Sequence, residues 1–145
     1  MRGSERLPPF RRAVRFEDID AAGIVFFARF YAYCHDAIEP MFVGYGESGY
    51  PGLIARGIGF PVVSCSADFR APLRYGDAAI IEASIEAMGR SSCTFGFVVR
   101  RERDDVVSAT VRHVTVMTDV KAMKSTPIPD DLRAQLAPYV RATTT

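Results

Sequence analysis

The sequence RRAVRFEDIDAAGIVFFARFYAYCHDAIEPM, residues 11–41, decides the fold class because it changes from a strand pattern to a helix pattern. Residues 11–16 favour a first strand, and residues 17–23 form a polar turn that ends in Ala-Ala-Gly. From Phe27 to Met41, apolar residues recur at three- and four-residue intervals, which predicts a helix with one broad apolar face. Pro40 is expected to end or kink this helix.

After a glycine-rich stretch that predicts a loop over residues 44–52, the apolar period changes from helical spacing to two. Residues 62–69 predict a half-buried strand, with Val63, Cys65, Ala67 and Phe69 on one side. The same alternation covers residues 81–87, 95–99 and 107–117, separated by a tight reversal at Gly89 and by a charged turn over residues 101–105. These short connections imply an antiparallel meander, so the order of one strand, one helix and four strands predicts an α+β domain.

The last part of the chain predicts a short helix over about residues 130–140. Asp130 is positioned to cap it, Leu132 and Leu136 share its apolar face, and the Thr-rich end is expected to fray. A length of 145 residues with 48% apolar residues fits one domain, residues 1–145, with a core of about residues 10–129.

Composition argues against several classes of protein. Eighteen basic residues nearly balance seventeen acidic ones, so no overall field favours nucleic acid or an anionic membrane. The N-terminal residues lack the apolar stretch of a secretory signal and no later run could span a bilayer, so we expect a cytoplasmic protein. Cys34, Cys65 and Cys93 form no Cys-x-x-Cys pair that could hold a metal. We therefore expect all three to be reduced and to pack in the fold, and we expect no metal site.

Asp20 is the main candidate for chemistry, because it precedes a Gly-containing turn and the start of the predicted helix. Free N–H groups and the positive dipole end of a helix can stabilise an oxyanion, and a nearby carboxylate can act as a nucleophile or orient water. Both functions suit acyl transfer. A carboxylate at this position could equally cap the helix or stabilise the turn.

The segment resembles the active-site signature of the 4-hydroxybenzoyl-CoA thioesterase family, Asp-x-x-Gly-(Ile/Val)-Val-(Phe/Tyr). The matching residues are Asp20-Ala-Ala-Gly23-Ile-Val-Phe26, and the resemblance continues through residues 57–77 to about residues 119–129. It implies a hot-dog fold, in which an antiparallel sheet wraps around a long central helix. It also implies hydrolysis of acyl-CoA thioesters, with an aryl-CoA such as 4-hydroxybenzoyl- or benzoyl-CoA favoured.

The resemblance also implies roles for individual residues. Asp20 would be the nucleophile or the general base, the Phe27 N–H would donate to the thioester carbonyl, and Gly23 would let the chain approach the substrate. An acyl-aspartyl anhydride and direct attack by water both remain open. No cofactor is expected, since coenzyme A is part of the substrate. The family builds its active sites where two subunits meet, so we expect a homodimer or homotetramer.

Further residues are weaker candidates for the site. Phe26, Tyr31 and Phe60 could enclose an aryl group or build the core, and His35 could line the acyl pocket or have a structural role. Lys121 and Lys124 could contact the anionic nucleotide of coenzyme A. Asp18 could share a side with Asp20 in an extended chain, but is interpreted as a solvated turn residue or a local hydrogen-bond acceptor; His113 is interpreted as structural.

Three other functions compete with thioester hydrolysis. A hydratase of the same fold would need a catalytic histidine, and neither an Asp followed five residues later by His nor a His-Phe-x-x-Gly segment occurs in the sequence. A non-catalytic module could bind an acyl thioester in the same pocket. Nucleic-acid binding would need a basic face, which the sequence lacks.

Overall fold

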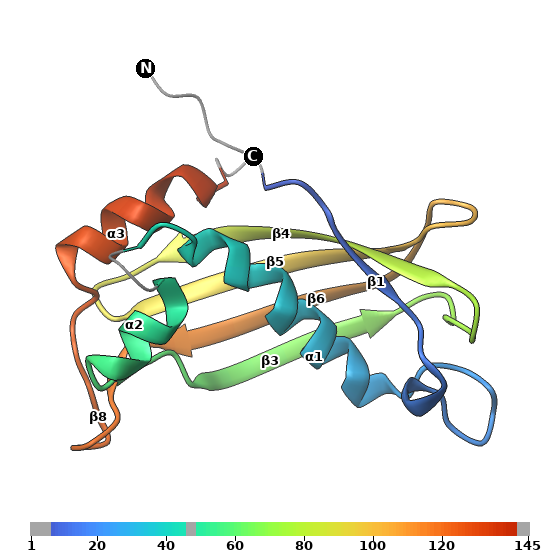
Figure 1. The fold of residues 1–145 in the computed structure, drawn as a ribbon, viewed down its shortest axis with the longest axis horizontal. Coiled ribbons are helices and arrows are strands. Elements are labelled where there is room, and N and C mark those ends of the chain that lie inside the picture. The colour runs from blue at the N-terminus through green and yellow to red at the C-terminus, as the bar shows by residue number, and fades with distance from the viewer. Residues whose placement is uncertain (1–6, 46–48, 142–145) are drawn as a thin grey trace.

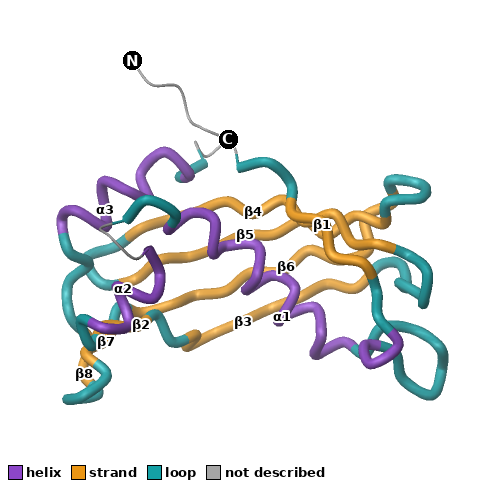
Figure 2. The backbone as a smooth tube through the Cα atoms, in the orientation of Figure 1, coloured by secondary structure: helices purple, strands orange, loops and turns teal. Residues whose placement is uncertain are grey.

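The computed structural model describes residues 7–45 and 49–141 and contains an antiparallel sheet with a helix across one face (Figures 1 and 2). The five-stranded sheet has the order β1-β4-β5-β6-β3, and the helix is α1 (Phe27–Ile38). The strands are β1 (Phe10–Ala13), β3 (Val62–Phe69), β4 (Ala78–Met88), β5 (Ser92–Arg101) and β6 (Val106–Val116). The α+β class and the order of one strand, one helix and four strands are as the sequence predicts.

The centre of the sheet is the predicted meander of β4, β5 and β6. Ile85 lies opposite Phe95, and Phe97 lies opposite Val111, so their side chains point together into the core. The alternate residues face away from α1 and are mostly polar. The tight reversal between β4 and β5 is closed by the Gly89 N–H, which donates to the Ser92 carbonyl at 2.9 Å.

Helix α1 packs its apolar face on this sheet. Phe30, Tyr33, Cys34, Ala37 and Ile38 are buried. The helix ends at Ile38, two residues before Pro40, because proline lacks the N–H and clashes with the preceding turn; a 3₁₀ turn, η2 (Glu39–Phe42), follows. The predicted end of the helix is confirmed.

Smaller elements close one end of the sheet. These are α2 (Gly49–Ala55), β2 (Ile58–Gly59), β7 (Thr118–Asp119), β8 (Lys124–Ser125), α3 (Asp130–Leu136) and η3 (Ala137–Tyr139). Strands β2, β7 and β8 form a separate three-stranded sheet. Leu132 and Leu136 of α3 are fully buried, as the spacing predicts.

Four predictions about local structure are wrong. The first strand ends at Ala13, and residues 16–18 form the 3₁₀ turn η1 (Phe16–Asp18), because the Asp18 carboxylate accepts the Arg15 N–H and closes a turn. Part of the predicted loop over residues 44–52 belongs to α2, while residues 46–48 lie outside the described residues. Helix α3 has Pro129 as its N-cap, so Asp130 does not cap it.

The predicted fraying of residues 142–145 is not one of these four, because it lies outside the described residues.

The fourth wrong prediction concerns β3, which is exposed on both faces rather than half-buried. It is the last strand of the sheet, and of its eight residues only Ala67 is partly buried. Its alternating pattern describes a strand correctly, but among the described residues α1 covers it only in part, mainly where Phe69 meets Phe27 and Phe30. Cys65 is therefore exposed, which corrects its expected role as a packing residue, whereas Cys34 and Cys93 are fully buried and all three are free.

Candidate active site

Asp20 lies in a tight loop between η1 and α1. The loop begins at the bridge between Ile19 and Val25, and the Gly23 N–H donates to the Asp20 carbonyl at 2.9 Å. The exposed Asp20 carboxylate accepts the Ala22 N–H at 2.8 Å, so it has the turn-stabilising role that the sequence left open. This bond uses one oxygen and leaves the carboxylate accessible.

Gly23 has a backbone requirement of its own. Its φ is +78°, a left-handed conformation that favours glycine, while a Cβ at this position would meet no atom within 4 Å. Backbone conformation therefore accounts for glycine at this position, without a close approach to any other group.

The first turn of α1 supplies hydrogen-bond donors next to this loop. Phe26 is the N-cap residue and makes no side-chain cap. Among the described residues, the N–H groups of Phe27 and Ala28 have no hydrogen-bond acceptor, as expected of the first turn of a helix. These groups and the helix dipole can stabilise a negative charge that develops on an oxygen.

A cavity of about 590 Å³ connects the carboxylate with the helix start. Asp20, Phe26 and Phe27 all line it, together with Phe30, Phe69 and Arg70. The Phe69 ring lies 5.1 Å from that of Phe30 and 6.4 Å from that of Phe27. Phe26, Phe27 and Phe69 are each about half exposed, at 45%, 56% and 45%. These exposed aromatic rings provide an apolar surface against which a ligand can pack.

Three predicted substrate-binding residues lie outside this cavity. Tyr31 is half-buried with its ring 5.8 Å from His113, and burial followed by the neighbouring Cys65 thiol raises the pKa of Tyr31. His35 is exposed, with its ring 6.2 Å from Tyr50. Phe60 packs between the Phe42 and Phe95 rings, at 6.3 and 6.5 Å. Within one chain, the structure therefore assembles only part of the predicted pocket.

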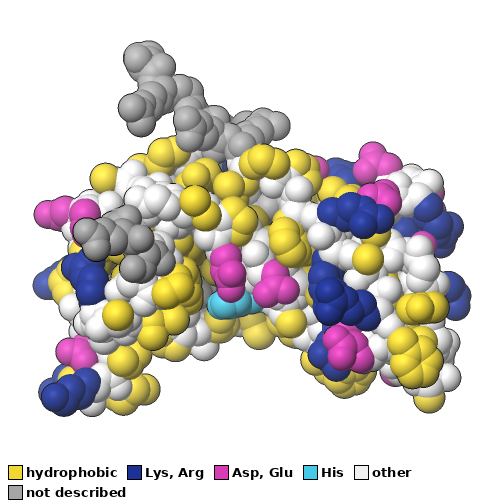
Figure 3. Space-filling model, in the orientation of Figure 1, with side chains coloured by type: hydrophobic (Ala, Val, Ile, Leu, Met, Phe, Trp, Pro, Cys, Tyr) yellow, Lys and Arg dark blue, Asp and Glu magenta, His cyan; other side chains and the backbone are white. Residues whose placement is uncertain are grey.

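Lys121 and Lys124 are also far from Asp20 within one chain. Both are exposed, Lys121 after β7 and Lys124 in β8. Figure 1 shows β8 and the loop before α1 at opposite ends of the molecule. Basic side chains on the viewed face of Figure 3 gather mostly toward the end that carries the loop.

Asp18 differs most from its sequence interpretation. It does accept a local hydrogen bond, from the Arg15 N–H at 2.9 Å, but its side chain is 1% exposed and is not solvated. The Tyr33 hydroxyl donates to the same oxygen at 2.7 Å, and Arg12 and Arg29 lie 3.8 and 3.9 Å away. Burial raises the pKa of the Asp18 carboxyl, but these donors and cations outweigh burial and hold that pKa below its usual value.

Sequence reasoning missed Phe69 and Arg70 as residues of the cavity. The alternation in β3 identifies the face on which Phe69 lies, but not that this end of β3 meets the first turn of α1. His113 is buried between the Tyr31 and Phe97 rings, and burial, followed by the nearby His35, lowers the pKa of His113. A buried histidine with a lowered pKa is uncharged at neutral pH and fits the predicted structural role.

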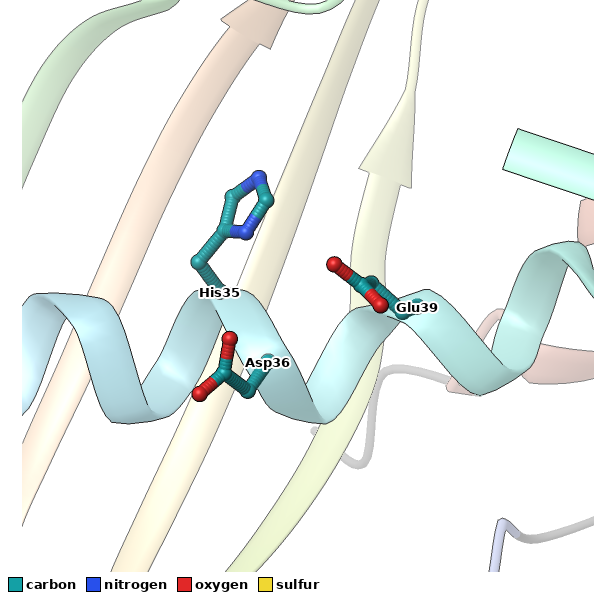
Figure 4. A group of neighbouring side chains, drawn as sticks. All are labelled: His35, Asp36 and Glu39. Atoms are coloured by element: carbon teal, nitrogen blue, oxygen red, sulfur yellow. The ribbon is translucent and has the colours of Figure 1, made fainter. Parts of the chain in front are cut away.

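His35, Asp36 and Glu39 form a polar group farther along α1 (Figure 4). Their potential ligand atoms lie within 4.8 Å of one another, and all three side chains are exposed. In Figure 4 the His35 ring and the Asp36 carboxylate point in different directions from the helix. None of the three lines the cavity at Asp20.

Comparison with known proteins identifies the family. Residues 14–136 match the model of the thioesterase-like superfamily. The chain belongs to this superfamily. The predicted family, the hot-dog fold and the assignment as a thioesterase are therefore confirmed.

Individual members of the thioesterase-like superfamily agree with this assignment. A 1,4-dihydroxy-2-naphthoyl-CoA hydrolase from Prochlorococcus marinus (strain MIT 9303) is 34% identical over 113 residues, which are 73% of this chain and 75% of the relative. The structure of a gentisyl-coenzyme A thioesterase has 30% identity and a TM-score of 0.77, and the match covers 86% of this chain and 98% of the other. The structure of the Synechocystis 1,4-dihydroxy-2-naphthoyl-CoA thioesterase has 24% identity and a TM-score of 0.80, and the match covers 90% of this chain and 95% of the other. This match supports the fold alone.

Within the part of the chain that the structure describes, no helix combines the length and the apolar character needed to span a membrane.

Proposed function

We propose that this chain hydrolyses aryl-CoA thioesters, such as 4-hydroxybenzoyl- or benzoyl-CoA, to the free acid and coenzyme A. The observation that supports this most directly is the arrangement around the cavity. The accessible Asp20 carboxylate and the first N–H groups of α1 lie beside exposed aromatic rings. The pocket therefore offers a nucleophile or base, oxyanion donors and an apolar surface for a ring.

Two routes fit these groups. In the first, an Asp20 oxygen bonds to the thioester carbon, and the Phe27 N–H stabilises the oxyanion. The C–S bond then breaks, coenzyme A leaves as a thiolate that takes up a proton, and water hydrolyses the resulting anhydride. In the second, Asp20 takes a proton from a water molecule, which attacks the carbonyl directly; the C–S bond then breaks, and the leaving thiolate takes up the proton. Neither route requires a metal or a prosthetic group.

An aryl substrate is favoured by the cavity and by the relatives. Three phenylalanines around the cavity, Phe26, Phe27 and Phe69, expose their rings, which suits stacking or edge contact with an aromatic group. The two kinds of relative described above are named for naphthoyl and gentisyl thioesters, both of which are aromatic acyl groups. Their identities of 34% and 30% leave the ring substituents open.

The complete site is proposed to contain residues from two copies of the chain. Strand β3 is an edge strand of eight residues, and an uncovered edge with exposed Val62, Val63 and Phe69 favours pairing with another strand. Antiparallel pairing of two β3 strands brings the start of one strand beside the end of the other. The segment from Phe60 of the second copy would then approach Phe69.

This pairing would account for three of the predicted residues that lie far from Asp20 within one chain. Phe60 lies two residues before the start of β3, and β2, which ends at Gly59, pairs with β7 of the sheet that also contains β8. In the proposed dimer, Phe60, Lys121 and Lys124 of the second copy lie toward the cavity of the first. They could then contact the substrate as predicted, with the lysines near the anionic nucleotide.

The hydrolysis test measures thiol release from benzoyl-, hydroxybenzoyl-, acetyl- and longer acyl-CoA by the wild type and by Asp20→Asn. We expect turnover of the aryl thioesters, and a fall of at least about 100-fold in Asp20→Asn with a small change in affinity. A folded Asp20→Asn protein with wild-type turnover would contradict the role of Asp20. Absence of turnover by the wild type on the whole panel, with retained binding, would identify a non-catalytic acyl-thioester-binding module.

The dimer is tested by sedimentation under reducing conditions. We expect a homodimer or homotetramer, and Val63→Lys on β3 should shift it toward the monomer because it places a charge at the pairing edge. Ala13→Lys on the opposite edge strand, β1, is the matched control and should leave the mass unchanged. Finding only a 16.0 kDa species of the wild type would refute the proposed dimer.

A further inference from the structure

Asp18 makes contacts that connect both sides of the active-site loop. Its carbonyl accepts the Phe26 N–H at 2.9 Å, which joins the start of the loop to the residue before α1. Its carboxylate accepts the Tyr33 hydroxyl at 2.7 Å, from a residue two turns into the same helix. One residue therefore fixes the loop that carries Asp20 against the helix that carries the Phe27 N–H.

The neighbouring arginines add to this connection. Arg29, in the first turn of α1, donates to the Glu17 carbonyl at 3.2 Å and has its Nε 3.9 Å from Asp18. The Arg12 guanidinium, from β1, lies 3.8 Å from Asp18 Oδ2, the oxygen that accepts the Tyr33 hydroxyl, and 5.1 Å from the centre of the Tyr33 ring. Strand β1, the loop and α1 thus meet at a single carboxylate.

Burying this charge carries a desolvation cost, which its hydrogen-bond donors and neighbouring cations must offset. Among the described residues, Asp18 Oδ1 and Arg12 Nε are buried and have no hydrogen-bond partner. Unpaired buried polar atoms destabilise a fold and are rare. Hydrogen bonds from Arg15 and Tyr33 and the nearby cations offset this cost, so the ionised carboxylate depends on β1, the loop and α1 meeting there.

We propose that Asp18 is a positioning residue, whose buried carboxylate holds the Asp20 loop against α1 and so sets the distance from the Asp20 carboxylate to the Phe27 N–H. This role rests on the proposed catalytic function of Asp20. Asp18 touches no reacting atom. Its effect on the reaction comes from geometry, since a displacement of about 1 Å between reacting groups can lower a rate by about 100-fold.

The test compares Asp18→Asn and Tyr33→Phe with Tyr45→Phe. Asp18→Asn removes the charge at nearly constant size, and Tyr33→Phe removes only the hydroxyl bond between helix and loop. Tyr45 is the matched control: it is also a buried tyrosine whose hydroxyl donates to a carboxylate, that of Asp131 at 3.1 Å, and it lies outside the cavity.

We expect kcat on an aryl-CoA substrate to fall by about 10- to 100-fold in Asp18→Asn and by a smaller factor in Tyr33→Phe, with KM nearly constant. Tyr45→Phe should keep the wild-type kcat even where its melting temperature is lower. Hydrogen exchange provides a readout that needs no activity: the amides of Asp20, Gly23 and Phe26 should exchange faster in the first two variants than in Tyr45→Phe. These three amides donate within the loop.

The outcomes separate the positioning role from the proposed reaction. If folded Tyr33→Phe and Asp18→Asn match Tyr45→Phe in loop exchange and in kcat, Asp18 does not position the loop. If Asp18→Asn fails to fold, the comparison of Tyr33→Phe with Tyr45→Phe gives the same decision. If the wild type turns over no CoA thioester, the proposed function fails. Hydrogen exchange then tests the positioning role separately, and loop amides that exchange no faster in Asp18→Asn and Tyr33→Phe than in Tyr45→Phe would overturn it.

Discussion

The two ends of helix α1 both carry charged groups, but in different environments. At the N-terminal end, the Asp18 carboxylate is buried and bonded to Tyr33, while Asp20 is exposed at the mouth of a cavity. Near the C-terminal end, His35, Asp36 and Glu39 are all exposed. Water screens exposed charges and competes for their hydrogen bonds, so closeness alone does not fix their geometry. A buried hydrogen-bond partner, such as Tyr33 for Asp18, therefore fixes the geometry of a site more than the number of polar groups does.

The largest expected difference between the two ends is in the free energy of unfolding. Asp18→Ala should lower it by about 3 kcal/mol, because it leaves the buried Tyr33 hydroxyl and the partly buried Arg12 guanidinium without their acceptor. Asp36→Ala, an exposed aspartate on the same helix, should change it by at most about 0.5 kcal/mol. Urea unfolding of both variants at neutral pH checks this. Equal losses in the two variants would remove the distinction.

A smaller effect on the free energy of unfolding is expected when low pH neutralises Asp18 in the wild-type protein. The folded-state pKa of Asp18 lies below its ordinary value of 3.8, so its contribution to stability is present above that value. The contribution is lost as pH falls from about 4 through the folded-state pKa, when the carboxylate takes up a proton. The stability difference between wild type and Asp18→Asn should therefore shrink between pH 7 and pH 3. A constant difference over this range would show that ionised Asp18 contributes nothing specific.

The smallest expected effect concerns His35. If His35 recognises a polar substituent on the substrate ring, His35→Ala should change the selectivity between hydroxybenzoyl- and benzoyl-CoA by about 0.5–1.5 kcal/mol, the value of one hydrogen bond. Stability should be unaffected, since the side chain is exposed. The measurement is the ratio of kcat/KM for the two thioesters. An unchanged ratio would show that His35 does not recognise the ring substituent.

The sequence determined those features that depend on local pattern. A period of two predicted β4, β5 and β6, and helical spacing together with Pro40 predicted α1 and its end, because each pattern reflects one side buried against the same core. The residues from Asp20 to Phe26 predicted the turn, the start of the helix and the resemblance to the family. These features need no knowledge of which distant segments meet.

Tertiary structure decided what the same residue types do. Asp18 and Asp20 are separated by one residue, and the sequence favours a solvated turn position for Asp18. The η1 turn instead directs Asp18 inward, where it meets Tyr33 and Arg12. Phe69 joins Phe27 and Phe30 only because the end of β3 lies against the first turn of α1. The exposure of β3 follows from its place at the edge of the sheet. Burial and pairing of this kind arise from contacts between segments far apart in sequence, and the local sequence pattern does not predict these contacts.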